Sequence, residues 1–574
     1  MAPRIIIDFP HGSGQPARRL FHAPQRIITA RHCSEVLPAL EAIQRDTEAG
    51  ATAVGFISYE AAPAFDDAFK TRAPNSVPLL WFAVFEQEQA ATFEMRVSDH
   101  SRAWQSDTPR PAYASAVQRI HDEIAAGTTY QVNYTVRMHA PFSGDPLAAY
   151  ESLRHAQGVG YHAYIETDDW CVLSLSPELF FESNGLRIHT RPMKGTRPRG
   201  RYGEEDEALT EELRGSEKER AENLMIVDLM RNDIGRVAQP GSVQVTRLYD
   251  VERYPTVLQM TSTVEATLRP ETTLAEVMSA LFPPGSVTGA PKISTMALIA
   301  ELEQAPRGVY CGALGIVERN SWVFNVPIRT IWLDRHAGSA EYGTGSGITA
   351  DSRTGDEFGE LITKTAVVAQ PWPHFDLLET MRAESGAIIR LDGHLQRLAE
   401  SAEYFGFHYC EVNIRDRLRE QLPAITGAAR IRLLLSADGE TQVQVEQLES
   451  LPEVRRVACA RQPVDARDRF LCHKTTRRAV YEKQAQAAPD MFDVLLFNER
   501  DEITEFTRAN VVLELGGERF TPARSCGLLA GVFRGELLAQ GVIKERVIHR
   551  TEVTSAQRIW WINSVREWVD VELA

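Results

Sequence analysis

The chain has 574 residues, of which 43% are hydrophobic and 24% are charged, and its formal net charge is -16. This length exceeds what one hydrophobic core fills, so we expect an ordinary globular protein of at least two domains. The negative charge argues against nucleic acid or an anionic membrane surface as the main partner, and no apolar run approaches the ~18 residues of a membrane span.

The predicted elements of the first half come in a clear order along the chain. Up to about residue 110, short apolar stretches alternate with Pro-rich breaks, which indicates sheet and loops. A helix is predicted over 113–127, and strands are predicted over 130–140, 171–183 and 186–193. Residues 204–230 are strongly helical, 308–348 are rich in strands, and 354–369 form a closing helix.

The segment QPWPH, residues 370–374, is the best candidate for a domain boundary. Its two prolines stop the preceding helix and make a semi-rigid connector. We therefore expect a first domain over 1–369, a linker over 370–374 and a second domain over 375–574. The second domain begins with strand, turn, strand and helix over 375–407.

The seven cysteines are scattered, and no CxxC pair occurs. This pattern predicts reduced thiols in a cytoplasmic protein rather than a disulfide framework or a zinc site. The N-terminal segment MAPRIIIDFPHG lacks the apolar core of a signal peptide, which supports the same expectation.

A lysine, Lys194, lies inside a short Pro-bounded turn, TRPMKGTRPRG, over residues 190–200. Arg191 and Arg197 flank it, so the segment by itself fits a solvated loop or an anion-binding rim. A lysine held between a proline and a glycine also fits a positioned nucleophile. The residues alone leave both interpretations open.

Carboxylates recur at helical spacing in two places. Glu219 and Glu222 lie at i,i+3, and Glu357, Glu360 and Lys364 lie at i, i+3 and i+7. Such pairs are usually surface charges, and Glu360 with Lys364 is an ordinary i,i+4 ion pair. The alternative is that two helices bring carboxylates to one cavity, where Mg²⁺ favours their oxygens.

A Gly-rich stretch, YGTGSGI, covers residues 342–348. No clear helix follows it in a βαβ unit, so a dinucleotide-binding fingerprint is not indicated. A tight turn is the simplest interpretation. The alternative is a set of backbone N–H groups that cradles a carboxylate.

A series of motifs in the first half resembles the chorismate-utilising enzymes, and the resemblance covers roughly residues 50–368. This family includes anthranilate, isochorismate and salicylate synthases and component I of aminodeoxychorismate synthase. The resemblance implies a two-sheet sandwich with flanking helices. The motifs are YQVNYT, SPELFF, PMKGT, RAENLMIVDLMRNDIGRV, LFPPGSVTGAPK, IRT and GSGITADS.

The resemblance assigns Lys194 a chemical role. Anthranilate synthases typically have alanine at this position of the P-x-x-G-T motif, whereas aminodeoxychorismate synthases have lysine. The implied lysine attacks C2 of chorismate and expels the C4 hydroxyl, and ammonia then attacks C4 and expels the lysine. Covalent catalysis of this kind splits one difficult substitution into two easier ones, and the lysine must attack as the neutral amine.

Further roles are implied residue by residue. Glu178 resembles the general acid/base beside the lysine, and Glu222 and Glu360 resemble Mg²⁺ ligands supported by Glu219 and Glu357. Chorismate is the implied substrate. The other implied substrate-binding residues are Arg329 and Tyr310 for the enolpyruvyl carboxylate, Thr288 beside them, and Lys364, Gly345 and Gly347 near the ring carboxylate.

One position departs from many relatives. Where they carry a histidine near the leaving hydroxyl, this chain has Gln259. Glutamine can donate a hydrogen bond but cannot deliver a proton at neutral pH. Assistance to the leaving group would then fall to Glu178, Mg²⁺ or water.

The second half, over about 375–574, resembles the fold-type IV pyridoxal-phosphate enzymes through GHLQRLAESAEYFGF, HKTTRRAVYEK, EITEFTRANVVL and LLAGVFRGELL. These enzymes include class IV aminotransferases and 4-amino-4-deoxychorismate lyase. The cofactor needs a lysine, a carboxylate on its pyridine nitrogen and a phosphate cup. The resemblance implies Lys474 for the first, Glu505 for the second and, for the cup, Arg397, Gly531, Val532 and Ser564.

The whole chain is therefore expected to be an α/β (α+β) enzyme of the folate pathway. Its first half would aminate chorismate with ammonia from a separate glutamine amidotransferase subunit, and its second half would eliminate pyruvate to give 4-aminobenzoate. A homodimer through the second domain is a further expectation. The alternatives are an anthranilate- or salicylate-type synthase with an attached transaminase, or a C-terminal half that is a non-catalytic interaction module.

Overall fold

A computed structural model describes residues 2–11, 15–86, 103–369 and 374–574. The chain divides into two compact units. The first contains residues 1–198 and 210–373, and the second contains residues 199–209 and 374–574. Residues 199–209 therefore belong to the second unit, although the chain returns to the first unit after them.

The first unit is built on two antiparallel sheets, as the sequence predicted. The first sheet has the order β15-β7-β19-β18-β9-β8-β1-β2, with β6 beside β7. Its strands are β15 (Gly289–Ala290), β7 (Gln131–Pro141), β19 (Ser339–Ile348), β18 (Thr330–Asp334), β9 (Trp170–Ser176), β8 (Tyr161–Glu166), β1 (Arg4–His11), β2 (Gln15–His22) and β6 (Gln105–Ser106).

The second sheet has the order β12-β14-β11-β10-β17-β16-β4-β5-β3, with β13 beside β14. Its strands are β12 (Met193–Pro198), β14 (Val257–Thr267), β11 (Arg187–Arg191), β10 (Leu179–Asn184), β17 (Ser321–Asn325), β16 (Ala313–Glu318), β4 (Thr52–Ile57), β5 (Leu80–Phe85), β3 (Arg26–Ala30) and β13 (Gln244–Arg253).

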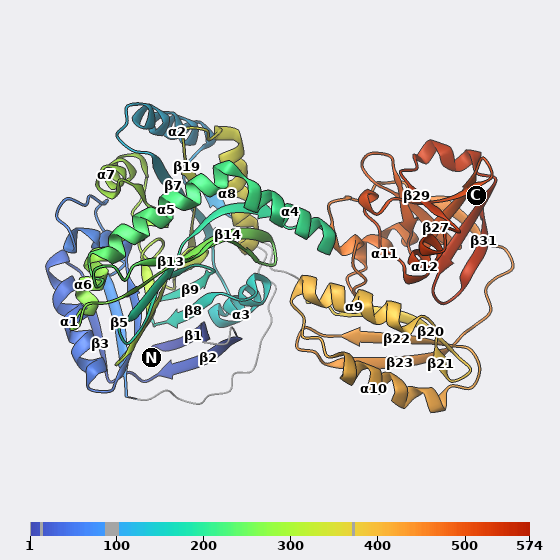
Figure 1. Ribbon diagram of the computed structural model, residues 1–574, viewed down its shortest axis with the longest axis horizontal. Coiled ribbons are helices and arrows are strands. Elements are labelled where there is room, and N and C mark those ends of the chain that lie inside the picture. Colours follow the sequence, from blue (N-terminus) through green and yellow to red (C-terminus); the bar gives the residue numbers. More distant parts are fainter. Residues whose placement is uncertain (1, 12–14, 87–102, 370–373) are drawn as a thin grey trace. The chain divides into compact units, whose positions relative to one another are not determined.

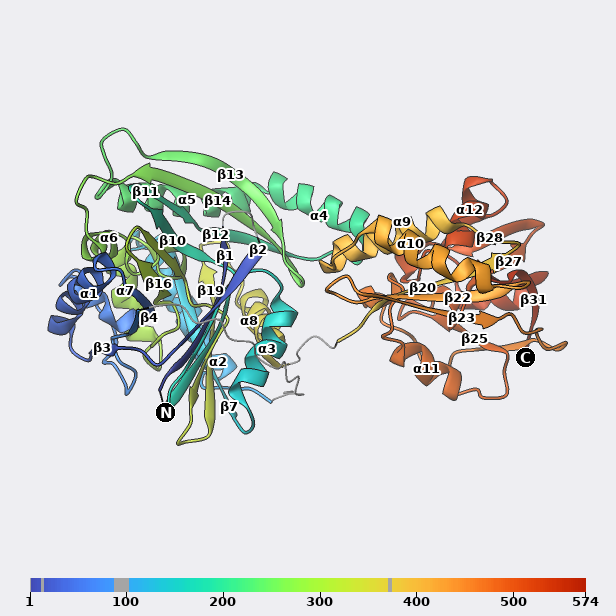
Figure 2. The same cartoon turned by 90° about the horizontal axis from the view of Figure 1, so that it is seen from below.

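Three apolar layers hold the first unit together. A cluster that includes Ile5 and Ile165 from one sheet and Phe56 and Ile316 from the other fills the space between the sheets. The helices cover the outer faces, and α1 packs against β3 and β5 (Figures 1 and 2). They are α1 (Cys33–Glu48), α2 (Arg110–Ala125), α3 (Pro146–Gln157), α5 (Glu217–Gly235), α6 (Leu274–Leu281), α7 (Lys292–Leu302) and α8 (Thr354–Ala369).

Two local predictions in this unit were wrong. The first 110 residues contain α1 besides sheet and loops. The strongly helical segment predicted over 204–230 is confirmed, and it consists of two helices, α4 (Gly203–Gly215) and α5. Ser216 separates them because its hydroxyl accepts the backbone N–H of Glu219 and caps α5. The stretch 342–348 is not a turn: it lies in β19, which pairs with β7 along its whole length.

Among its described residues, the second unit contains two further sheets, the helices α9 to α12 and the first part of α4. Figure 2 shows α9 and α10 on one side of the smaller sheet, where α9 packs on β20 and α10 on β23. The smaller sheet is β21 (Ala387–Ile388), β20 (Leu377–Glu384), β22 (Ala429–Leu435) and β23 (Thr441–Gln447), and its helices are α9 (Leu391–Phe405) and α10 (Glu411–Gln421).

The larger sheet is mixed, because β24 runs parallel to both β25 and β31. The helices α11 (Ala479–Gln486) and α12 (Val532–Ala539) pack on β25 and β30. The strands, in sheet order, are β26 (Ile503–Phe506), β25 (Asp493–Phe497), β24 (Arg456–Cys459), β31 (Glu567–Leu573), β30 (Arg558–Asn563), β27 (Asn510–Leu515), β28 (Glu518–Pro522) and β29 (Lys544–Arg546).

Residues 199–209 are anchored inside the second unit by polar contacts. Arg199 and Asp206 form an ion pair of 2.5 Å, and their side chains are only 4% and 3% exposed. The Arg199 guanidinium also lies 4.4 Å from the ring of Tyr404, whose hydroxyl donates to the carbonyl of Gly200. The backbone carbonyl of Arg201 lies 3.0 Å from Nε2 of His473.

No described helix is long and apolar enough to cross a membrane. The predicted linker 370–374 lies outside the described residues except for His374.

Candidate functional site

Lys194 lies on β12 at an irregularity of the second sheet. Met193 pairs with Thr261 of β14, but the next pair is Thr196 with Gln259. Between these two pairs the chain advances three residues along β12 and only two along β14, which is a β-bulge. Such a bulge re-aims a side chain out of the regular alternation. Gly195 in the bulge has φ +100°, which glycine adopts without strain.

The amine of Lys194 lies close to β19. Its side chain is 14% exposed, and Nζ lies 3.8 Å from Oε2 of Glu222. A Cβ on Gly347 would lie 2.1 Å from this Nζ and 2.4 Å from Nε2 of Gln131. Only a glycine therefore leaves room for the amine at this point of β19.

Gln131 is a site residue to which the sequence analysis gave no role. It is 1% exposed, and neither atom of its side-chain amide has a hydrogen-bond partner. A buried amide without partners is costly unless a ligand satisfies it. Its place in the YQVNYT motif, at an inward-facing position of a strand, is the signal that could have identified it.

Glu178 lies in the break between β9 and β10, and it is 3% exposed. Burial raises the pKa of its carboxyl to about 7, although the hydroxyl of Ser286, the backbone N–H of Met193 and the charge of Lys194 all lower it. A carboxyl of this kind can both give and take a proton near neutral pH. The structure thus brings Glu178 and Lys194 together.

The carboxylates of α5 are close to Lys194. Burial raises the pKa of Glu222, while the charge of Lys194 lowers it and those of Glu219 and Glu357 raise it further. Glu219 accepts a hydrogen bond of 2.9 Å from Arg197. Arg197 is therefore paired with α5.

The second pair of carboxylates lies on α8. Glu357 accepts from the hydroxyl of Ser352, and Glu360 pairs with Lys364 at 2.7 Å. Nζ of Lys364 also donates to the carbonyl of Gly345 on β19. The helix α8 is thereby held against the strand that carries Gly347.

The carboxylates suit a hard divalent cation in their chemistry. The charge of Glu357 raises the cost of ionising Glu222, which a cation beside Glu222 would relieve. Mg²⁺ commonly uses one or two protein carboxylates and takes its other oxygens from substrate and water. Within the described ranges, no cluster of three or more His, Cys, Asp or Glu side chains is arranged to hold an ion by itself.

The three residues expected near the enolpyruvyl group lie in different surroundings. Arg329 precedes β18 and donates to Oε1 of Gln157 at 2.7 Å. Tyr310 is 7% exposed and lies under Arg137, 5.0 Å from its guanidinium carbon. Burial lowers the pKa of Arg329, although the nearby hydroxyls of Tyr342 and Tyr254 raise it.

Thr288 is fully buried and satisfied within its own loop. Its hydroxyl donates to the carbonyl of Pro284, and its carbonyl accepts the backbone N–H of Asn133. It connects the Gly285-containing loop to β7 near Gln131.

The second unit has its own cluster around Lys474. The pKa of Lys474 is lowered to about 8, mainly by burial. The charges of Arg397 and Arg478 also lower it, whereas those of Glu379 and Glu505 raise it. The backbone carbonyl of Lys474 accepts the N–H of Leu378 on β20, which fixes the chain at this position. A lysine with such a pKa is a good nucleophile near neutral pH.

Glu505 on β26 is 4% exposed, and burial raises its pKa to about 7. Its carboxyl accepts hydrogen bonds from the hydroxyl of Tyr481 at 2.8 Å and from the backbone N–H of Leu529 at 3.2 Å. The carboxyl is therefore fixed in orientation and close enough to Lys474 to interact electrostatically.

Arg397 on α9 makes a two-point ion pair with Glu379 and donates to the carbonyl of Ala530. These bonds use three of the five N–H groups of its guanidinium, which leaves donors for an anion. Gly531 caps α12, and a Cβ there would lie 2.0 Å from Oδ1 of Asn510. Gly531 therefore allows Asn510 to pack against the N-terminus of α12, the kind of helix end that suits an anion.

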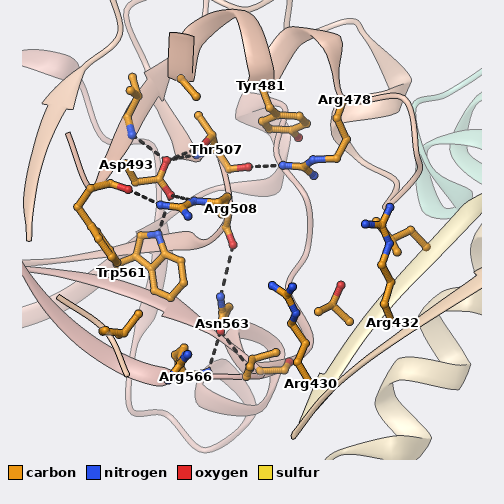
Figure 3. Close-up of a pocket in the computed structure, with 18 of the residues that line it drawn as sticks. Arg430, Arg432, Arg478, Tyr481, Asp493, Thr507, Arg508, Trp561, Asn563 and Arg566 are labelled. Atoms are coloured by element: carbon orange, nitrogen blue, oxygen red, sulfur yellow. Dashed lines mark hydrogen bonds and ion pairs between the residues drawn. The ribbon is translucent and has the colours of Figure 1, made fainter. Parts of the chain in front are cut away.

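A cavity of about 1060 Å³ lies at this cluster, and Lys474, Arg397 and Ser564 line it. Glu505, Gly531 and Val532 are not among its lining residues. Figure 3 shows further arginines around it. Arg478 donates to the Thr507 carbonyl, and Arg508 pairs with Asp493. The arginines are Arg430, Arg432, Arg478, Arg508 and Arg566.

These groups fit pyridoxal phosphate. A buried lysine, a fixed carboxylate and an arginine beside a helix N-terminus are the three features that the cofactor requires. The cavity has room for a cofactor and a substrate of small-molecule size.

Comparison with known proteins gives the same division of the chain. The family model for chorismate binding enzymes matches residues 86–370, and that for class IV amino-transferases matches residues 376–574.

Individual relatives agree with the first match. Aminodeoxychorismate synthase component 1 of Bacillus subtilis is 34% identical over 354 residues, which are 54% of this chain and 75% of that protein. The Klebsiella aerogenes protein of the same name is 40% identical over 287 residues, 50% of this chain and 62% of that protein. Anthranilate synthase component I from Streptococcus pneumoniae is 25% identical, with a TM-score of 0.52 over 64% of this chain and 92% of that structure.

The fold and the matches define a two-part enzyme. The chain belongs to the chorismate binding enzymes and continues into a class IV amino-transferase domain.

Proposed function

We propose that the enzyme makes 4-aminobenzoate from chorismate in two steps, amination in the first unit and elimination of pyruvate in the second. The observation that carries the first step is Lys194, which a bulge of β12 places close to Gly347, Glu222 and Glu178. A lysine at this position distinguishes aminodeoxychorismate synthases from anthranilate synthases by resemblance. The names of the Bacillus and Klebsiella relatives support the same choice.

In the proposed amination, the neutral amine of Lys194 forms a bond to C2 of chorismate, the double bond shifts, and the C4 hydroxyl leaves as water after protonation. Ammonia then forms a bond to C4, the double bond shifts back, and the amine of Lys194 leaves. Glu178, whose pKa is about 7, exchanges the protons of the Lys194 amine. Gln131 offers its unpaired amide to the incoming nitrogen.

Mg²⁺ is proposed to bind Glu222 and Glu360 together with the ring carboxylate of chorismate, with Glu219 and Glu357 orienting these ligands. The cation would neutralise charge on the substrate, and Lys364 and the backbone of β19 would bind the same end of the molecule. Arg329 and Tyr310 are proposed to bind the enolpyruvyl side. Arg329 is the better supported of the two because its guanidinium is oriented by Gln157.

Ammonia is proposed to come from a glutamine amidotransferase subunit. The designation "component 1" of the relatives supports the existence of a partner component for them. A cytoplasmic location, a homodimer through the second unit and the boundary at 370–374 are parts of the same proposal.

The second step is proposed to be an elimination at the Lys474 cluster. Bound pyridoxal phosphate would supply an electron sink at the carbon that carries the amine. Lys474 would hold the cofactor and then take the C4 proton, so that the C3 enolpyruvyl ether leaves as pyruvate and the ring becomes aromatic. The arginine-lined cavity supports a substrate with two carboxylates, because guanidinium groups bind carboxylates at two points.

The test is product analysis of the purified enzyme with chorismate, ammonium, Mg²⁺ and pyridoxal phosphate. We expect 4-aminobenzoate and pyruvate in equal amounts. Lys474→Ala should consume chorismate at the parent rate and accumulate 4-amino-4-deoxychorismate, which an added free-standing lyase converts. Anthranilate as the main product would refute the first step, and 4-aminobenzoate from Lys474→Ala at the parent rate would refute the second.

A further inference from the structure

The bulge that carries Lys194 has backbone groups that the sheet does not pair. Because β12 contains an extra residue between Met193 and Thr196, the carbonyls of Lys194 and Gly195 need hydrogen-bond partners outside the sheet ladder. Two side-chain amides supply them. Nδ2 of Asn223 on α5 donates to the Lys194 carbonyl at 3.2 Å, and Nε2 of Gln259 on β14 donates to the Gly195 carbonyl at 2.8 Å.

Gln259 also binds the bulge with its other amide atom. Its Oε1 accepts a hydrogen bond of 2.9 Å from the hydroxyl of Thr196, directly opposite on β12. The NH₂ group and the oxygen of the same amide thus form hydrogen bonds with two consecutive residues of the bulge. Asn223 is oriented in a similar way, since its Oδ1 accepts a bond of 2.6 Å from Ser262, three residues beyond Gln259.

These contacts give Gln259 a role different from the one considered from the sequence. Its amide is directed to the Gly195 carbonyl and the Thr196 hydroxyl of β12. A glycine with φ +100° beside Lys194 would otherwise let the bulge move, because glycine restricts the backbone least. The direction of the Lys194 side chain therefore depends on the two hydrogen bonds of Gln259.

We infer that Gln259 is a positioning residue that fixes the bulge at Gly195 and Thr196 and so aims the amine of Lys194. The inference deepens the proposed amination and rests on it for the effect on turnover. Reactivity of the Lys194 amine toward an external reagent is a separate measure, because it requires no particular reaction with chorismate.

The experiment compares Gln259→Leu, which keeps the size but removes both hydrogen-bonding groups, with the parent enzyme. We expect kcat for chorismate consumption with ammonium to fall by about 100-fold, the typical effect of displacing a reacting group by about 1 Å, with little change in KM. Acetylation of the free enzyme, followed by peptide mapping, should show faster modification of Lys194 and unchanged modification of the other lysines. Gln244→Leu on the exposed strand β13 is the matched control and should behave as the parent.

Thr196 supplies a second, milder test. Thr196→Val removes the hydroxyl without changing the shape and should give a smaller loss of kcat, whereas Thr196→Ser restores the hydroxyl and should restore kcat. Equal rates for the valine and serine variants would overturn the role of this hydrogen bond.

A double variant separates positioning from general support of the fold. If Gln259 acts through Lys194, adding Gln259→Leu to Lys194→Ala should not lower the residual chorismate turnover further. Independent losses that multiply, or unchanged acetylation of Lys194 in Gln259→Leu, would overturn the inference. Full 4-amination by Lys194→Ala would refute the proposed amination instead, and the acetylation result would still decide the role of Gln259.

Discussion

Two lysines carry the proposed chemistry, and they lie in different environments. Lys194 has a carboxylate, Glu222, 3.8 Å from its amine, and its flanking arginines are paired elsewhere, Arg191 with Glu252 and Arg197 with Glu219. Lys474 has cationic neighbours instead. Arg191 and Arg197 flank Lys194 in the sequence, but it is at Lys474 that arginine charges, those of Arg397 and Arg478, lower the pKa of the amine.

Replacing Lys194 should stop amination at C4. In Lys194→Ala, ammonia has no covalent intermediate to displace, so we expect at least about a 100-fold loss of 4-amino-4-deoxychorismate formation. Product analysis by chromatography is the measurement, and exposed Lys70→Ala is the control. Undiminished formation of the 4-amino product would exclude the covalent role.

Cofactor capture by Lys474 should depend on pH. The amine reacts with the cofactor's aldehyde only when neutral, and its pKa lies at about 8 rather than at the ordinary 10.5. The neutral fraction grows as the pH rises through the pKa, so the rate at which cofactor-free enzyme takes up pyridoxal phosphate should rise from pH 6 and reach half its maximum near pH 8. Rapid-mixing absorbance measures it, and a midpoint near 10 would contradict the buried, cation-flanked environment.

At the scale of elements, the helices α5 and α8 each carry carboxylates that lie close to β12 and β19. Ser216 starts α5 where Glu219 and Glu222 face Lys194, and Lys364 ties α8 to β19 through the Gly345 carbonyl. Glu219 of α5 and Glu357 of α8 are near enough to Glu222 to raise its pKa. The approach of these elements, rather than any single spacing, creates the candidate cation site.

Neutralising a carboxylate on either α5 or α8 should weaken the binding of Mg²⁺ to the enzyme. Glu222→Gln and Glu360→Gln should each raise the Mg²⁺ concentration for half-maximal chorismate turnover by about tenfold or more, as expected for loss of one ligand. The absorbance of the pyridoxal cofactor should not change. Asp228→Asn, on the exposed face of α5, is the control, and a parent-like Mg²⁺ titration of both glutamine variants would show that these carboxylates are surface charges.

The predictability of the site follows from which contacts are local. Helical spacing identified the carboxylate pairs of α5 and α8, and strand patterns identified β7 and β18, because these depend on neighbouring residues. The bulge at Lys194 was predicted as a turn, since the pairing of β12 with β14 is set by residues about sixty positions away. Gln131 was missed for the same reason: its importance comes from Gly347, which a distant strand places beside it.

At the scale of the whole molecule, the two units are not two consecutive lengths of chain. The second unit contains residues 199–209, which follow directly after β12 and its Lys194. This segment supplies Arg199 and Asp206, a buried ion pair, and a backbone carbonyl to His473, the residue before Lys474. The cofactor-binding unit is therefore completed by a piece that precedes it by more than 160 positions in the sequence.

Breaking the buried pair should destabilise the second unit. Asp206→Ala leaves the Arg199 guanidinium buried without its carboxylate, which typically costs about 3–5 kcal/mol. Thermal unfolding followed by cofactor absorbance should show an earlier loss of the second unit. Glu211→Ala, which breaks the exposed pair with Arg214, should change little, and equal unfolding temperatures for the two variants would contradict the anchoring role of 199–209.

The origin of residues 199–209 also bears on how the gene can be divided. A gene split at the codons for 370–373 would encode a C-terminal product that lacks part of its own unit, with the ring of Tyr404 and the imidazole of His473 left without the partners that this segment supplies. The N-terminal product would carry that missing segment as a tail without its binding surface. Separate production of the two units from this sequence therefore requires more than a cut in the linker: residues 199–209, or a substitute for them, must be joined to the C-terminal product.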